Sequence, residues 1–133
     1  MKNNLLSERL VYTGESQTPT HLHLCTYNAL EMQEVSGTDF QAVANALNHE
    51  EINWLQIHGL QNTELIREIC SHFEIDFLTL QDILNAEHPT KIEEHDKYTV
   101  LIMKTMVWLS IPITVMNSSP VTHNLRLYRR PIR

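Results

Sequence analysis

The sequence predicts a protein that mixes helices and strands (α/β in the broad sense, α+β in detail), with a mixed β-sheet flanked by helices. Segments that alternate between apolar and polar residues are typical of strands, and they are interspersed with segments of helical periodicity. The links between these segments are short, as in compact mixed folds. The chain has 133 residues, of which 42% are hydrophobic and 20% charged, so it is long enough for one domain with its own core.

Most of the expected strands lie in the N-terminal half of the chain. The first is a short entry strand at Leu10–Gly14, which ends at a glycine turn. The segment His21–Tyr27 alternates with a period of two, and Glu31–Val35 is expected to pair with it as a hairpin. A half-buried strand follows at Ile52–Ile57 and ends at Gly59.

Three helices are also expected: one before the strand Ile52–Ile57 and two after it. Thr38 is the expected N-cap of the first helix, which runs to about Asn48. Asn62 caps the second, and the third begins after Asp76 and ends before Pro89. The apolar stripe of the second helix consists of Leu65, Ile66, Ile69, Cys70 and Phe73.

The C-terminal third begins with two further expected strands. Lys91–Asp96 is a charged edge strand, and Tyr98–Trp108 is the most strand-like segment of the chain. The apolar stretch Val100–Met116 is shorter than the roughly 20 residues of a membrane-spanning helix, and it contains Lys104 and Pro112. We therefore expect a buried strand followed by irregular chain, with Trp54 and Trp108 packed in the core. No signal peptide is expected at the N-terminus.

Charge is distributed unevenly along the chain, whose net charge is −6. Residues 111–133 hold four of the ten basic residues and none of the sixteen acidic ones, so the rest of the chain is strongly acidic. An acidic body repels nucleic acid and attracts cations. The basic end could bind anionic lipid or nucleic acid, but a disordered or loosely packed tail is the interpretation that its composition favours. The two cysteines, Cys25 and Cys70, lack C-x-x-C spacing and fit a reduced, cytosolic setting.

None of the common catalytic motifs occurs in the sequence. His21 and His23 share one strand face and could chelate Zn²⁺, but no third ligand is predictable. A solvated polar strand face explains this pair more simply. The sequence therefore favours a protein that is not an enzyme, and a small metal-dependent hydrolase is the least favoured alternative.

Acidic residues surround the break after the third helix and suggest a site for a hard cation such as Mg²⁺. They are Asp82, Glu87, Glu93, Glu94 and Asp96. Each also has an ordinary structural explanation. Asp82 could complete a capping box with Thr79 and complement the helix dipole, and the neighbours Glu93 and Glu94 would face opposite ways on a strand.

Several segments, taken in order, resemble the N-terminal cytoplasmic domain of the CorA family of magnesium and cobalt transporters. They are Leu10–Gly14, Asn53–Leu60, Phe73–Asn85, His88–Tyr98 and Leu101–Met106, so the resemblance covers about residues 10–107. It implies a mixed sheet between helices, on the cytoplasmic side of the cell membrane, in a pentameric channel. It also implies that divalent cations, Mg²⁺ or Co²⁺, bind weakly between neighbouring domains and hold the channel closed.

The resemblance assigns a metal-ligand role to Asp82, which matches the aspartate of the family's L-E-D-I helix. The adjacent glutamate of the family is Gln81 here, so a second carboxylate is lost. The chain also departs from the family in lacking the long stalk helix with its partner acid, both membrane helices and the Gly-Met-Asn pore motif. Contact with a membrane is then expected only through those missing helices.

These observations divide the chain into residues 1–9 as an N-terminal tail, 10–110 as a CorA-like cytoplasmic domain, and 111–133 as a divergent or truncated basic tail. The function expected first is that of a regulatory, cation-sensing domain that self-associates and cannot transport ions alone. The alternative is a free-standing soluble binding module that kept the fold and lost transport.

Overall fold

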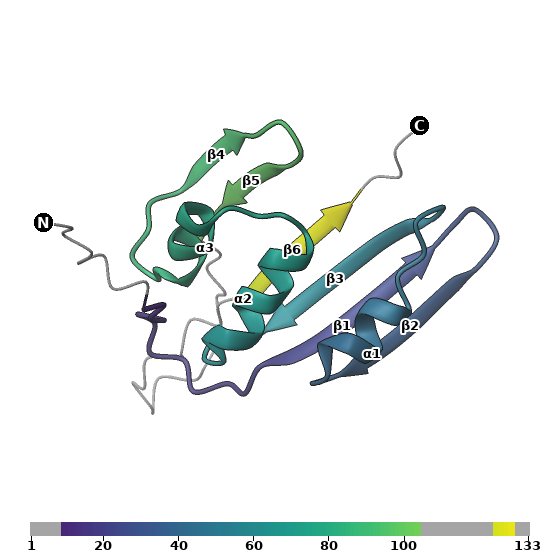
Figure 1. The fold of residues 1–133 in the computed structure, drawn as a ribbon, viewed down its shortest axis with the longest axis horizontal. Helices are drawn as coiled ribbons and strands as arrows, with labels where there is room; N and C mark the ends of the chain where they lie inside the picture. The colour runs from purple at the N-terminus through teal and green to yellow at the C-terminus, as the bar shows by residue number, and fades with distance from the viewer. Residues whose placement is uncertain (1–8, 105–123, 130–133) are drawn as a thin grey trace, which may run out of the picture.

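The computed structural model of the chain describes residues 9–104 and 124–129, and these residues confirm the α+β class (Figure 1). The elements in chain order are β1 (His21–Tyr27), β2 (Met32–Gly37), α1 (Phe40–Asn45), β3 (Ile52–His58), α2 (Thr63–His72), α3 (Phe77–Leu84), β4 (Lys91–Glu94), β5 (Thr99–Ile102) and β6 (Asn124–Arg129). Strands β2-β1-β3-β6 form one sheet in that order, while β4 and β5 form a separate two-stranded sheet.

All strand pairs among the described residues are antiparallel, whereas we expected a mixed sheet. A parallel pair needs a long crossover connection. The link between β1 and β2 is far shorter than that and suits a hairpin, which was the predicted arrangement.

One face of the large sheet is packed against the helices. Leu22 and Leu24 of β1 lie opposite Ile57 and Leu55 of β3, and none of these four side chains is more than 2% exposed. Buried residues of α1, α2 and α3 belong to the same hydrophobic core. Figure 1 shows α1 and α2 on the same side of the sheet. The period-two alternation predicted for β1 is therefore confirmed.

The first helix begins one residue later than we expected and is shorter. Asp39, not Thr38, is the N-cap, because its backbone is extended and its carboxylate accepts the Gln41 N–H at 3.0 Å. The helix ends at Asn45, not near Asn48.

The second helix follows its prediction closely. The Asn62 side chain accepts the N–H of Leu65 at 3.1 Å, as an N-cap does. Four of the five residues of the expected apolar stripe are buried, and Phe73 packs against the core as the C-cap.

The N-terminal segment contains a contradicted prediction. Leu10–Gly14 is not a strand, although Leu10 is buried in the core. The segment is attached to α3 through the Thr13 N–H, which donates to the Leu84 carbonyl at 3.1 Å. This backbone bond joins the segment to the end of a helix and not to a neighbouring strand, so Leu10–Gly14 is not part of a β-ladder.

Trp54 is a second contradicted prediction, because its side chain is not in the core. It lies between Asn53 and Leu55, which are both buried, so the alternation of β3 places it on the opposite face with 37% exposure. Trp108, the other expected core tryptophan, lies outside the described residues, as does the part of the last predicted strand beyond residue 104.

The basic tail expected at 111–133 contains a strand of the large sheet. Asn124–Arg129 pairs with β3, and its Leu125 and Leu127 take the register positions opposite Ile57 and Leu55. This alternation of leucine and polar residues is typical of a strand, so the prediction of a loose tail is wrong for this segment. Residues 111–123 and 130–133 of the tail, and 1–8 of the expected N-terminal tail, lie outside the described residues. In the part of the chain that the structure describes, no helix is long and apolar enough to cross a membrane.

Candidate functional site

The structure places Asp82 in the last turn of α3, beside the start of β4. Its Oδ2 atom accepts a hydrogen bond from the Lys91 ammonium at 2.6 Å, and its Oδ1 atom lies 3.4 Å from Nε2 of His88. The Asp82 side chain is 29% exposed, and those of Lys91 and His88 are 26% and 17% exposed. Asp82 is therefore a half-buried carboxylate whose counter-cation comes from its own chain.

This position contradicts the expected capping box. Asp76, not Thr79, is the N-cap of α3, and its carboxylate accepts the Thr79 N–H at 2.9 Å. Asp82 lies at the opposite end of the helix, where the dipole disfavours a negative charge. Lys91 compensates for this placement, because its ammonium lies 2.6 Å from Oδ2 of Asp82, while Nε2 of His88 lies 3.4 Å from Oδ1.

Lys91 joins Asp82 to a second carboxylate. Its ammonium lies 2.6 Å from Oε2 of Glu93, two residues further along β4. Hydrogen bonds to Asp82 and then to Glu93 raise the pKa of the Lys91 ammonium above its ordinary value. One lysine is thus bonded to two acids, and the three groups together carry a net negative charge.

The other acidic residues of the predicted cluster do not join this group. Glu94 occupies the next position on β4 and lies opposite Thr99, whereas Glu93 lies opposite Val100. The alternation of a strand places these neighbours on opposite faces, as we expected. Glu87 and Asp96 are exposed residues of the chain segments before β4 and after it. Within residues 9–104 and 124–129, no three His, Cys, Asp or Glu side chains are grouped so that they could hold a metal ion.

A second polar group lies at the N-terminal end of α3, and the sequence reasoning missed it. The Tyr98 hydroxyl donates a hydrogen bond to the Asp76 carboxylate, which also accepts from the Thr79 hydroxyl at 3.0 Å. The His95 ring stacks on Tyr98, with ring centroids 4.4 Å apart, and its Nδ1 lies 3.6 Å from Asp76. The bond from Tyr98 is the main cause that lowers the pKa of Asp76 to about 2. The Asp-x-x-Thr spacing at the helix start was the signal that could have revealed the cap.

The two groups hold the small β4–β5 sheet against α3 at both ends of the helix. Tyr98 and His95 contact its first turn through Asp76, and Lys91 contacts its last turn through Asp82. Figure 1 shows β4 and β5 next to α3, away from the large sheet. A cation that displaced Lys91 from Asp82 would therefore act on one of the two attachments of this hairpin.

The histidine pair of β1 lies as predicted, on one face of the strand. His21 is exposed, and His23 Nε2 lies 3.5 Å from Oε1 of Glu34 on β2. Both lie on the face opposite the core, since Leu22 and Leu24 are buried.

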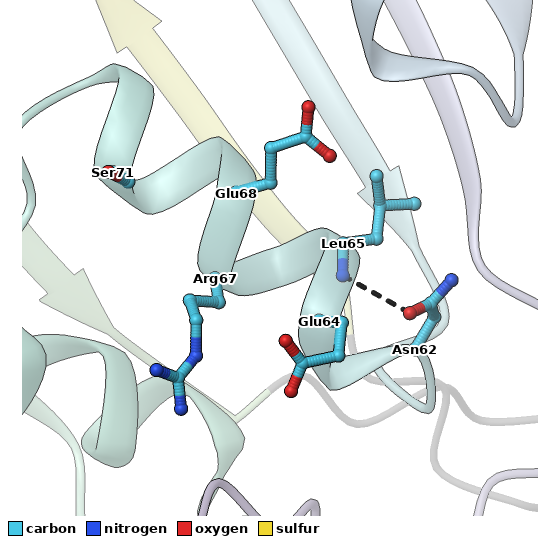
Figure 2. Close-up of a pocket in the computed structure, with 6 residues that line it drawn as sticks. All are labelled: Asn62, Glu64, Leu65, Arg67, Glu68 and Ser71. Atoms are coloured by element: carbon cyan, nitrogen blue, oxygen red, sulfur yellow. Dashed lines mark hydrogen bonds between the residues drawn. The ribbon is translucent and has the colours of Figure 1, made fainter. Parts of the chain in front are cut away.

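An open hollow on the exposed side of α2 offers no catalytic arrangement (Figure 2). Its lining residues are Asn62, Glu64, Leu65, Arg67, Glu68 and Ser71. Figure 2 shows Glu64 and Arg67 on one side of the helix and Glu68 on another, so the charged groups do not converge on one point. Asn62 caps the helix, and Glu68 accepts a hydrogen bond from the Gln41 side chain at 2.9 Å.

Comparison with known proteins supports a relationship with the CorA family. The chain is 27% identical, over 107 residues, to the cobalt/magnesium transport protein CorA of Thermotoga maritima. The match covers 80% of this chain but 30% of that protein, so the chain spans about a third of the length of its relative. No protein-family model matches the chain.

Proposed function

We propose that this chain is the N-terminal regulatory domain of a CorA-type magnesium/cobalt transporter and that it senses divalent cations on the cytoplasmic side of the membrane. The observation that carries this proposal is the similarity along 80% of the chain to a protein named for cobalt and magnesium transport. Because the chain corresponds to 30% of that protein, we assign transport itself to the remainder. In this proposal the chain has no enzymatic activity.

Asp82 is the proposed ligand for the cation, Mg²⁺ or Co²⁺. An ion that binds its carboxylate has to compete with the Lys91 ammonium, which lies 2.6 Å from Oδ2. Displacement of Lys91 also releases Oε2 of Glu93, whose Oε1 lies 3.5 Å from Nε2 of His95, so a second carboxylate oxygen becomes available to the dication. Mg²⁺ often binds through one or two carboxylates and keeps several of its waters. We therefore expect millimolar affinity.

The proposed response to the ion is a change in self-association. Asp82, Glu93 and Lys91 carry a net negative charge, so two copies that meet at this surface repel each other. A dication between them offsets that repulsion and favours the associated arrangement. Loss of the ion lets the copies separate, which is the physical basis proposed for sensing.

Removal of the Asp82 charge tests this proposal directly. We expect Asp82→Asn to abolish Mg²⁺ binding in isothermal titration calorimetry, because the amide keeps the shape of the side chain but loses its charge. Asp96→Asn is the matched control, since Asp96 is an exposed aspartate after β4. Equal Mg²⁺ binding by the parent and Asp82→Asn would remove Asp82 from the site.

The second candidate is a free-standing binding module that has the fold but no part in transport. The observation that favours it is that the described residues bury a hydrophobic core of their own, formed by the sheet and all three helices. This candidate predicts a stable protein whose stability and mass do not respond to Mg²⁺. Thermal unfolding with and without Mg²⁺ separates the two candidates, because a ligand that binds the folded state raises the midpoint of unfolding.

A further inference from the structure

The outer face of the large sheet, meaning the face opposite the core, brings together histidines that are distant in the sequence. His21 of β1 lies directly opposite His58 of β3 in the antiparallel register. In each strand the histidine lies on the face opposite the buried residues, which include Leu22 of β1 and Ile57 of β3. His21 is exposed and His58 is half-buried, so both rings are accessible.

Neither of these two imidazoles is engaged elsewhere. Among the described residues, the side chains of His21 and His58 take part in no hydrogen bond, ion pair or ring contact, whereas His23 is 3.5 Å from Glu34. A pair of solvent-accessible imidazoles at facing positions has no evident structural role on this strand face. Its chemistry is that of a metal ligand, because neutral imidazole binds borderline transition-metal ions.

The register also supplies suitable geometry for two ligands to one ion. Side chains at directly opposite positions of an antiparallel pair have Cβ atoms about 4.5–5.5 Å apart. Zinc–nitrogen bonds are about 2.0–2.1 Å long, so two imidazole rings from these positions can reach one ion through rotation of their side chains. The backbone does not need to move, because the β1–β3 ladder fixes both positions.

We propose that His21 and His58 form a two-imidazole site for a transition-metal dication such as Zn²⁺. Water fills the remaining coordination positions, since the described residues offer no group of three ligands. The site is therefore open and exchangeable rather than structural. It does not depend on the proposed Mg²⁺ sensing, because Mg²⁺ prefers oxygen ligands and Asp82 lies on α3, not on this sheet.

Zinc titration of three single variants tests the proposal. We expect one Zn²⁺ per chain on the parent, and we expect His21→Gln and His58→Gln each to weaken Zn²⁺ affinity by about tenfold or more. His49→Gln is the matched control, because His49 is an exposed histidine on the link between α1 and β3. Circular dichroism checks that each variant keeps the fold. A parent-like affinity in either His21→Gln or His58→Gln would overturn the two-ligand site.

The same titration in excess Mg²⁺, and on Asp82→Asn, separates this site from the sensing site. We expect unchanged Zn²⁺ affinity in both cases. If Asp82→Asn abolished Zn²⁺ binding, the ion would lie at α3 and the imidazole proposal would be wrong. If Mg²⁺ sensing failed its own test while Zn²⁺ binding still required both histidines, only the sensing proposal would be lost.

Discussion

Lys91 is the residue that determines whether Asp82 is available to an external cation. Its ammonium is bonded to both Asp82 and Glu93 at 2.6 Å, so the chain supplies its own positive charge where the proposed dication binds. Because Lys91 already occupies this position, an incoming cation has to bind the two carboxylates more strongly than the ammonium does. A dication meets this condition better than a monovalent ion, since its charge is twice as large. Removal of Lys91 should therefore change affinity in a direction that a simple loss of structure would not produce.

We expect Lys91→Met to strengthen Mg²⁺ binding, because the ion no longer competes with an ammonium. Because the ion pair of Lys91 with Asp82 is partly exposed, we expect a modest gain, up to about a fivefold lower dissociation constant. Isothermal titration calorimetry measures the Mg²⁺ dissociation constant of each variant. Lys97→Met is the matched control. The Lys97 ammonium lies 2.8 Å from Oε1 of Glu74 and does not pair with Asp82. Weaker Mg²⁺ binding by Lys91→Met than by Lys97→Met would contradict competition at Asp82.

Asp76 gives a pH-dependent prediction at the other end of α3. Its pKa of about 2 lies below that of an unfolded aspartate, near 3.9. The ionised carboxylate therefore stabilises the fold above about pH 4, and this contribution is lost as the pH falls towards 2. Since the side chain is 44% exposed, the contribution should be modest, below about 1 kcal/mol.

We expect Tyr98→Phe to raise the titration midpoint of Asp76, because the hydroxyl that donates to its carboxylate is gone. Nuclear magnetic resonance of the carboxyl carbon measures this midpoint residue by residue. Tyr27→Phe is a control on β1, far along the chain from α3. A midpoint that is the same in the parent and Tyr98→Phe would show that Tyr98 does not stabilise the carboxylate.

The end of β3 depends on a glycine with a left-handed backbone. Gly59 has φ of +73°, and a Cβ atom there would lie 2.3 Å from the Thr18 carbonyl oxygen. We expect Gly59→Ala to lower the free energy of unfolding by about 1–3 kcal/mol. Gly37→Ala is the control, since a Cβ atom at Gly37 meets nothing within 4 Å. Denaturant unfolding compares the two, and equal losses would contradict this account of the turn.

Elements with strong periodicity were predictable, and those defined by a single contact were not. β1 and α2 were recognised because several consecutive residues obey one period, which burial later confirmed. The cap of α1 depends on whether Thr38 or Asp39 accepts the Gln41 N–H, and either side chain is able to do so. Leu10–Gly14 looked like a strand, but the Thr13 N–H donates to the Leu84 carbonyl at the end of α3 and not to a neighbouring strand.

The candidate site shows the same division. The sequence indicated Asp82 as a candidate ligand, but it did not reveal that Lys91 forms an ion pair with this carboxylate or that His88 lies beside it. Those partners depend on how the chain returns from α3 to β4, which no local pattern encodes. The helix start at Asp76 was expected, yet Asp82 was assigned to the first turn because Thr79 offered an apparent cap.

At the scale of the molecule, β6 is the feature that sequence reasoning failed to place. It pairs with β3 although the link between β5 and β6 passes through residues outside the described part of the chain. Its partner could not be predicted, because strand pairing over such a separation has no local signal. The sheet that results carries the core on one face and, on the other, the facing histidines of β1 and β3.

The mass of the protein in solution, with and without Mg²⁺, tests the central claim of cation sensing most directly. Sedimentation equilibrium of the parent and Asp82→Asn, in chelator and then in millimolar Mg²⁺, gives four masses to compare. The account predicts that Mg²⁺ increases the mass of the parent, that chelator reverses the change, and that Asp82→Asn does not respond. If the parent had the same mass in chelator and in millimolar Mg²⁺, the claim of cation sensing through self-association would be contradicted.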